Sequence, residues 1–314
     1  MKSNKILALV AAMTLLPSYS AMAASTQGKT DSFEAIKHQV NKWAVPKATL
    51  VVMDNDDTIS MMSCPDSAST TTCQYLGGAA WFAWQSEQVN SQKSPRVSEN
   101  FSDLLDISSF LFSISNMVFT RDNVAPVLKE LTGNGVRLLV ETARGNGDVN
   151  ATEDQFTNLL VAKETSLKTL IKENSLVLNK NGIASKASPY IPCSNSDMNP
   201  ITYQNGVMYL AGQDKGSNLR CMLDSYNAQQ GKASRVTNIV FIDDTLKNVQ
   251  SVHNEFLNNK NYTVLSLHYT ALAEHKLAFT QGRKAKEYQR VSMERWYKIK
   301  SAMELALLEP AIPN

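Results

Sequence analysis

The chain has 314 residues, of which 43% are hydrophobic and 19% are charged, and its formal net charge is +2. This balance is ordinary for a globular protein, and it excludes the strong basic excess that binding to nucleic acids or to anionic membrane surfaces requires. A chain of this length can bury a substantial core, either as one large domain or as a core with a smaller additional domain.

The first residues have the pattern of an export signal. Lys2 and Lys5 precede an apolar run at 6–16, and the small residues of the tripeptide at 21–23 follow at the spacing that signal peptidase recognises. The apolar run is shorter than the roughly 18 residues needed to span a bilayer. We therefore predict that residues 1–23 are a cleaved signal peptide and that the mature protein is periplasmic or secreted, with no membrane anchor.

Downstream of the signal, short apolar runs alternate with segments of helical periodicity. Continuous apolar runs of this length are typical of strands that are buried on both faces of a parallel sheet. The alternation predicts an open, doubly wound α/β domain with a mainly parallel sheet, in which ligands bind at the carboxyl ends of the strands. The expected strands are 48–53, 136–140, 207–210, 238–242 and 262–267, and the expected helices are 124–131, 156–170, 217–229 and 246–257.

The segment 59–119 interrupts this alternation, and we predict that it is an insertion that covers the strand ends. It contains the aromatic residues Trp81, Phe82 and Trp84. These residues form either a small hydrophobic core or a surface that stacks on an aromatic leaving group. A long helical pattern at 280–308 is expected to pack on the outside of the sheet.

Four cysteines in an exported chain predict disulfide bonds, because exported proteins fold in an oxidising environment. None of them has the Cys-x-x-Cys spacing that is typical of zinc and redox sites. Several pairings are possible, and we favour Cys64–Cys73 with Cys193–Cys221 because this pairing closes the shortest loops.

The first expected strand ends in the acidic sequence DNDDT at 54–58, which contains Asp54, Asp56 and Asp57. Carboxylates at the end of a buried strand are costly to desolvate unless counter-charges or a metal ion accompany them. Mg²⁺, a hard cation that prefers oxygen ligands, would meet this need. The alternative is a solvated acidic loop without a ligand.

Polar residues also follow the second expected strand. Thr142 offers a hydroxyl donor and Arg144 a charged donor for the oxygens of a phosphate. Glu141 beside them adds a negative charge that is unexpected at a phosphate site, unless it points away or pairs with Arg144. A threonine at a strand end is also common without any function.

A lysine begins the helical pattern that follows the third expected strand. Lys215 lies at the N-terminus of that helix, where a cation is electrostatically misplaced unless it faces an anion such as a phosphate. Lys163 and Lys168 are rival candidates for a phosphate-binding lysine. An ordinary surface position remains the alternative for Lys215.

The fourth expected strand is followed directly by Asp243 and Asp244. An N-terminal cap on the next helix is the competing explanation, and Asp244 would suit it. Capping accounts for one of the two aspartates but not for both. A metal site accounts for the pair, and Asn248 would be able to orient Asp244.

In this order, the motifs resemble those of phosphatases of the haloacid dehalogenase (HAD) superfamily. The sequence DNDDT at 54–58 fits the D-x-D-x-T motif that follows the first strand in that family. The threonine after the second strand, the lysine and the paired acidic motif follow in the same order, so the resemblance covers residues 48–268. The stretches WFAW at 81–84, KGxxL from Lys215 and HYT from His268 are similar to an uncharacterised group of exported bacterial HAD-like proteins.

The resemblance implies a Mg²⁺-dependent phosphomonoester hydrolase. Asp54 would be the nucleophile that forms an aspartyl-phosphate, and Asp56 would act as general acid and then as general base. The phosphoryl oxygens would be bound by Thr142, Lys215 and Arg144.

The resemblance also implies a metal site and a division into domains. The Mg²⁺ ligands would be the Asp54 carboxylate, the Asp56 backbone carbonyl and Asp243, with Asp244 either a direct or a water-mediated ligand. A HAD-like α/β core would comprise 24–58 and 120–314, and a cap insertion would comprise 59–119.

The partner implied by this reading is a phosphorylated small molecule, or a phosphoprotein if the insertion leaves the site open. No nucleic-acid partner is expected. Two other functions stay open. One is phosphoryl transfer to an acceptor other than water, and the other is an exported binding or effector protein that keeps the fold with little turnover.

Overall fold

The computed structural model describes residues 24–63, 73–177, 187–190 and 201–308. Its centre is an eight-stranded sheet. Six neighbouring strands are parallel to one another, and the remaining two strands at one edge pair antiparallel. The predicted α/β class with a mainly parallel sheet is therefore confirmed. In sheet order the strands are β1 (Ser25–Thr30), β12 (Thr263–Tyr269), β11 (Asn238–Asp243), β2 (Thr49–Met53), β5 (Arg137–Thr142), β10 (Val207–Tyr209), β9 (Ile201–Gln204) and β8 (Ala187–Tyr190).

Helices cover both faces of this sheet, because alternate residues of each buried strand point to opposite faces. Val51 and Leu138 belong to the hydrophobic cluster on one face, and their neighbours Val52 and Leu139 belong to the cluster on the other. We call the sheet and its helices the α/β body. The first face is covered by α1 (Glu34–Trp43), α4 (Val124–Gly133), α5 (Val149–Asn158) and α6 (Leu167–Asn174), and the second by α7 (Lys215–Ala228) and α8 (Leu246–Phe256).

Two parts of the α/β body differ from the prediction. The single helix expected at 156–170 is divided into α5 and α6 by a hairpin of β6 (Leu160–Ala162) and β7 (Thr165–Ser166). The side chain of Ser166 accepts a hydrogen bond from the Thr169 amide and caps α6, so a new helix begins there. Strand β1 was not expected, because its polar sequence lacks the apolar run by which the other strands were identified.

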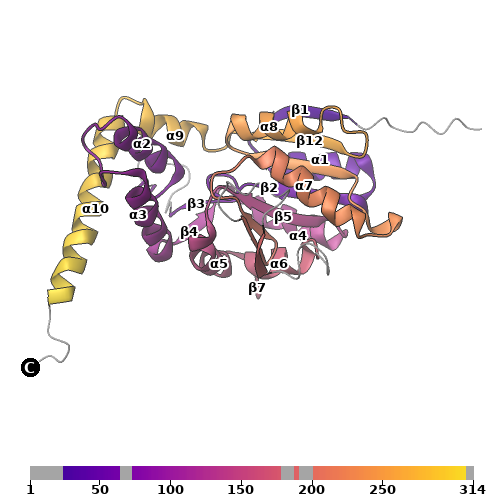
Figure 1. Ribbon diagram of the computed structural model, residues 1–314, viewed down its shortest axis with the longest axis horizontal. Coiled ribbons are helices and arrows are strands. Elements are labelled where there is room, and N and C mark those ends of the chain that lie inside the picture. Colours follow the sequence, from indigo (N-terminus) through magenta and orange to yellow (C-terminus); the bar gives the residue numbers. More distant parts are fainter. Residues whose placement is uncertain (1–23, 64–72, 178–186, 191–200, 309–314) are drawn as a thin grey trace, which may run out of the picture.

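Between β2 and α4 the chain forms a second, smaller unit. Strand β3 (Ser60–Met62) pairs with β4 (Met117–Phe119), and α2 (Ala79–Asn90) and α3 (Phe101–Ile114) lie between them in the sequence. The C-terminal helices α9 (Ala273–Thr280) and α10 (Ala285–Leu308) join this unit at one end of the molecule (Figure 1). We call α2, α3, α9 and α10 the helical body.

The helical body has its own hydrophobic core. Trp81 and Trp84 of α2 pack in one cluster with Phe279 of α9 and with Met293 and Trp296 of α10. The two tryptophans are therefore core residues, as one of the two sequence-based readings proposed. The long C-terminal helix buries its apolar side in this cluster and not on the outside of the sheet, so the predicted packing of 280–308 is wrong.

Several predictions concern residues outside the described ranges. The predicted signal peptide at 1–23 lies outside them, and no helix in the described part of the chain is long and apolar enough to cross a bilayer. Cys73 and Cys221 are each disulfide-bonded. Because Cys64 and Cys193 lie outside the described residues, the pairing of the four cysteines stays a prediction.

Candidate active site

Three adjacent strands of the sheet end at the candidate site. Asp54 follows β2, Thr142 is the last residue of β5, and Asp243 is the last residue of β11. Strands β11, β2 and β5 are parallel neighbours, so their carboxyl ends lie along one edge of the sheet. The Asp54 amide extends this pairing by donating to the carbonyl oxygen of Ile242 at 3.0 Å. Lys215, the first residue of α7, reaches the same edge.

A buried ion cluster links two of these carboxylates through the lysine. The ammonium of Lys215 lies 2.5 Å from Asp54 Oδ1 and 2.7 Å from Asp243 Oδ2, and the three residues are 3%, 7% and 0% exposed. Burial raises the pKa of Asp54 to about 7, although the charge of Lys215 opposes the shift. Burial also acts to lower the pKa of Lys215, but Asp243 and Asp54 raise it above its ordinary value. The lysine is therefore held as a cation between two acids.

The carboxylates could also hold a metal ion. Asp54, Asp243 and Asp244 each offer one oxygen, and these oxygens lie within 4.8 Å of one another. Thr58 connects the two acidic loops, because its hydroxyl donates to Asp54 Oδ2 at 3.3 Å and accepts from the Asp244 amide at 3.1 Å. Asn248 donates to both oxygens of Asp243 at 3.1 and 3.2 Å, so it orients Asp243 and not Asp244, for which it was proposed.

The helix-capping explanation for Asp244 does not match the structure. The cap position of α8 is occupied by Thr245, whose side chain makes no capping hydrogen bond. The Thr245 amide instead donates to Asp243 Oδ1 at 2.7 Å. Asp244 pairs through its carboxylate with Lys276 of α9, and its carbonyl oxygen lies 3.1 Å from Nε2 of His268.

Asp56 is held by an arginine from the neighbouring strand end. Nε and Nη2 of Arg144 donate to the two carboxylate oxygens of Asp56 at 2.9 and 2.6 Å, which is the paired geometry that favours specific orientation. Nη1 of Arg144 donates to Thr152 and Gln155 in α5. Arg144 was expected to bind the phosphate, but in the structure its donors are directed to Asp56 and α5. The arginine therefore orients the acidic loop.

Glu141 and Thr142 lie on opposite faces of β5. The Thr142 hydroxyl accepts from the Arg144 amide at 3.2 Å. Glu141 is fully buried on the α7 side, and neither of its oxygens has a hydrogen-bond partner among the described residues. Burial raises the pKa of Glu141 well above its usual value, with Lys215 opposing the shift. Glu141 therefore points away from Thr142, and Arg144 pairs with Asp56 and not with Glu141, which removes the conflict anticipated from the sequence.

Lys276 reaches the acidic loops although nothing in the sequence pointed to it. It extends from α9 in the helical body to Asp244, and its ammonium lies 3.6 Å from Asp57. Asp57 has a positive φ of 61° and is buried, and burial raises its pKa while Lys276 opposes the shift. No local pattern in the sequence of α9 indicates this contact, because it depends on how the helical body lies against the sheet.

The rival lysines lie elsewhere. Lys168 pairs with Glu153 at 2.7 Å, and Lys163 is exposed in the turn between β6 and β7. Of the three lysines considered from the sequence, the structure therefore brings Lys215 to the acidic residues.

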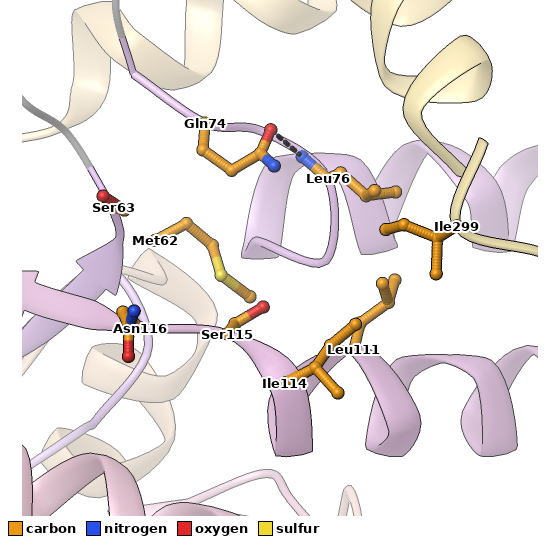
Figure 2. Close-up of a pocket in the computed structure, with 9 residues that line it drawn as sticks. All are labelled: Met62, Ser63, Gln74, Leu76, Leu111, Ile114, Ser115, Asn116 and Ile299. Atoms are coloured by element: carbon orange, nitrogen blue, oxygen red, sulfur yellow. Dashed lines mark hydrogen bonds between the residues drawn. The ribbon is translucent and has the colours of Figure 1, made fainter. Parts of the chain in front are cut away.

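The helical body contains a cavity of about 210 Å³ that is separate from the acidic cluster. Figure 2 shows Met62, Leu76, Leu111 and Ile299 facing this space. At its edge the Leu76 amide donates a hydrogen bond to the side-chain oxygen of Gln74. The cavity lining contains no carboxylate and no cation, so it lacks the charged groups that meet at the sheet edge.

The chain matches the family described as "Protein of unknown function (DUF2608)" over residues 29–303. Because this match spans most of the sequence, including both the α/β body and the helical body, the chain belongs to that family. No curated protein shows significant similarity to the chain.

Proposed function

We propose that this member of the DUF2608 family is an exported, Mg²⁺-dependent phosphomonoester hydrolase of the HAD type, with Asp54 as its nucleophile. The observation that carries the proposal is the buried ammonium of Lys215 between Asp54 and Asp243, at the carboxyl ends of β2 and β11. A fixed cation beside a carboxylate nucleophile stabilises the charge that develops on a phosphoryl group during transfer.

The acidic residues suit a hard divalent cation. The oxygens available from Asp54, Asp243 and Asp244 are all carboxylate oxygens, and they lie close enough together to share one ion. We assign these residues to Mg²⁺, together with the backbone carbonyl of Asp56. Bound Mg²⁺ would supply charge neutralisation at the phosphoryl oxygens and would favour the ionised form of Asp54.

The proposed reaction has two steps. In the first, an Asp54 oxygen bonds to phosphorus while the bond from phosphorus to the leaving oxygen breaks, and the leaving oxygen takes a proton from Asp56. In the second, Asp56 accepts a proton from water, and the water oxygen bonds to phosphorus while the bond to Asp54 breaks. Thr142 and Lys215 would bind the phosphoryl oxygens in both steps.

The helical body is the proposed cap. Its helix α3 contacts Arg144 through the ring of Phe112, and its helix α9 contacts Asp244 through Lys276. Contacts from both helices to the acidic loops would allow the cap to control which substrates reach Asp54. We propose a phosphorylated small molecule as the substrate, with a phosphoprotein as the alternative if the cap leaves the site open.

The test is hydrolysis of p-nitrophenyl phosphate by the mature protein. Activity should require Mg²⁺, should be abolished by EDTA, and should be lost in Asp54→Asn. A wild type that hydrolyses none of several phosphomonoesters from acid to neutral pH would contradict the proposal and would favour a binding protein. Transfer to added alcohols in preference to water would identify a phosphotransferase.

A further inference from the structure

The orientation of the Asp56 carboxylate is set by Arg144. Both oxygens of Asp56 accept from the guanidinium, and the arginine side chain is 2% exposed whereas that of Asp56 is 23% exposed. A guanidinium presents its donors in a rigid plane, so a carboxylate that accepts two of them has a fixed direction as well as a fixed position. Asp56 is thus partly accessible to solvent, while the arginine that holds it is buried.

The support itself is fixed on its other side. Nη1 of Arg144 donates to Thr152 Oγ1 at 2.9 Å and to Gln155 Oε1 at 2.8 Å. The ring of Phe112 covers the guanidinium, with its centroid 3.9 Å from Cζ of Arg144. Every nitrogen of this guanidinium therefore has a hydrogen-bond partner, and one flat face of it is packed against an aromatic ring.

Phe112 belongs to α3, and α3 is attached to the strand-end region at two points. Nε2 of Gln155 donates to the Phe112 carbonyl oxygen at 2.7 Å. Ser109 Oγ donates to Asp148 Oδ1 at 2.5 Å, and Asp148 Oδ2 accepts from the Gly145 amide at 3.0 Å. The helical body therefore supports Arg144 directly, and through Arg144 it supports Asp56.

We propose that Arg144 is a positioning residue that directs Asp56 at the leaving oxygen, and that Phe112 of the helical body holds Arg144 in place for this purpose. The inference rests on the proposed function, since it concerns the proton transfer in the first step. It differs from the sequence-based assignment, in which Arg144 binds the phosphate, and the two assignments predict different kinetics.

The difference depends on the leaving group. As the bond from phosphorus to the leaving oxygen breaks, its electron pair passes to that oxygen, which takes the proton of Asp56. An alkyl alkoxide needs this proton far more than a nitrophenolate does, because nitrophenolate is a stable anion. A misdirected Asp56 should therefore slow alkyl esters selectively, whereas loss of a phosphate contact should slow all esters alike.

The experiment compares kcat/KM for glycerol 2-phosphate and p-nitrophenyl phosphate in Arg144→Lys and Phe112→Leu, with Mg²⁺ present. Lysine keeps the charge but cannot donate two parallel bonds to one carboxylate. We expect Arg144→Lys to lower kcat/KM for the alkyl ester by on the order of 10²-fold and for the aryl ester by less than about 10-fold. Phe112→Leu should shift the ratio in the same direction by about 10-fold or less.

Arg137→Lys is the matched control. Arg137 is the first residue of β5, at the end of the strand opposite Arg144, and its guanidinium also packs on an aromatic ring, 5.5 Å from the centroid of Tyr226. This variant should leave the ratio of the two kcat/KM values unchanged. Melting temperatures establish that each variant is folded, and Phe112→Leu carries the test if Arg144→Lys does not fold.

The outcomes separate the two proposals. Equal loss for both esters in Arg144→Lys, or a rise in KM common to both, would overturn the positioning role and leave the hydrolase intact. An unchanged ratio in both variants would overturn it as well. A wild type that hydrolyses neither ester would overturn the proposed function and this inference with it.

Discussion

At the edge of the α/β body a buried cation is paired with two carboxylates, whereas in the helical body a buried histidine is stacked on an aromatic ring. Lys215 lies between Asp54 and Asp243. His275 of the helical body stacks on Tyr75 with their centroids 4.2 Å apart, and its Nδ1 has no partner among the described residues. Under the proposed function, the sheet edge carries the chemistry, because its charged groups can interact with a phosphorylated substrate, and the helical body supports it.

The largest expected effect is on activity at the sheet edge. Asp54→Asn keeps the shape of the side chain and removes the nucleophile, so hydrolysis should fall by on the order of 10⁴-fold or more, as for other covalent catalytic residues. Steady-state assays with p-nitrophenyl phosphate measure this loss. Asp122→Asn, at an exposed position, is the control and should retain full activity. Retained activity in Asp54→Asn would show that Asp54 is not the nucleophile.

The next largest effect is on stability. Lys215→Met leaves Asp54 and Asp243 buried without their counter-ion, and removal of one partner of a buried pair costs about 3–5 kcal/mol. Urea unfolding should show this loss, and Mg²⁺ should restore part of it by taking the place of the missing charge. Lys129→Met, at an exposed position of α4, is the control. A Lys215→Met variant as stable as the wild type would show that the buried carboxylates do not need this counter-ion.

A smaller effect should come from Glu141, the buried acid without a partner. Its pKa is raised by burial, so the unfolded chain releases this proton at lower pH than the folded protein, and folding stability falls as pH rises above about 4. Glu141→Gln removes this dependence and should stabilise the protein by about 2 kcal/mol at pH 7, with no gain near pH 4.

Glu153 is the matched control, because its pKa is shifted in the opposite direction. Burial acts to raise its pKa, but hydrogen bonds from Lys168, Gln204 and Asn205 lower it below its ordinary value. The stabilising contribution of the ionised Glu153 is therefore present at neutral pH and is lost as the pH falls through the lowered pKa. Glu153→Gln should destabilise the protein at pH 7 by less than about 1 kcal/mol, because its partner Lys168 is partly exposed and solvent screens the pair. Equal effects of the two substitutions in urea unfolding would contradict the assignment of a proton to Glu141.

The smallest effect tests the helical body. Burial lowers the pKa of His275 to about 4, so the stability that depends on its neutral form is complete above the unfolded pKa of about 6.5 and is lost as pH falls toward about 4. His275→Phe keeps a ring beside Tyr75. When the pH falls from 7 to 5, the folding stability of this variant should decrease by about 1 kcal/mol less than that of the wild type. His38→Gln, at an exposed position, should follow the wild type in the same thermal melts.

The sequence was sufficient to predict the strands that meet at the site. Asp54 and Asp243 follow apolar runs, and the ends of parallel strands must meet at one edge, so their proximity follows from the pattern. The position of Lys215 at the start of a helix could be predicted in the same way. Each of these predictions depends on local sequence and on a general property of α/β sheets.

The remaining contacts depend on packing between distant segments. The sequence pattern of α10 shows that one side of the helix is apolar. It does not show whether this side packs against the sheet or, as in the structure, against Trp84 and Phe279. The pairing of Lys276 with Asp244 follows from that packing. The pairing of Arg144 with Asp56 requires the geometry of two loops, and the sequence supplied only the two residue types.

The proposed mechanism requires that Asp54 becomes phosphorylated during turnover. Mature protein mixed with Mg²⁺ and an aryl phosphate, quenched in acid and examined by mass spectrometry, should carry one phosphoryl group on the peptide that contains Asp54. Asp54→Asn should carry none. Turnover by the wild type without any phosphorylated peptide, or with the phosphoryl group on another residue, would contradict the account.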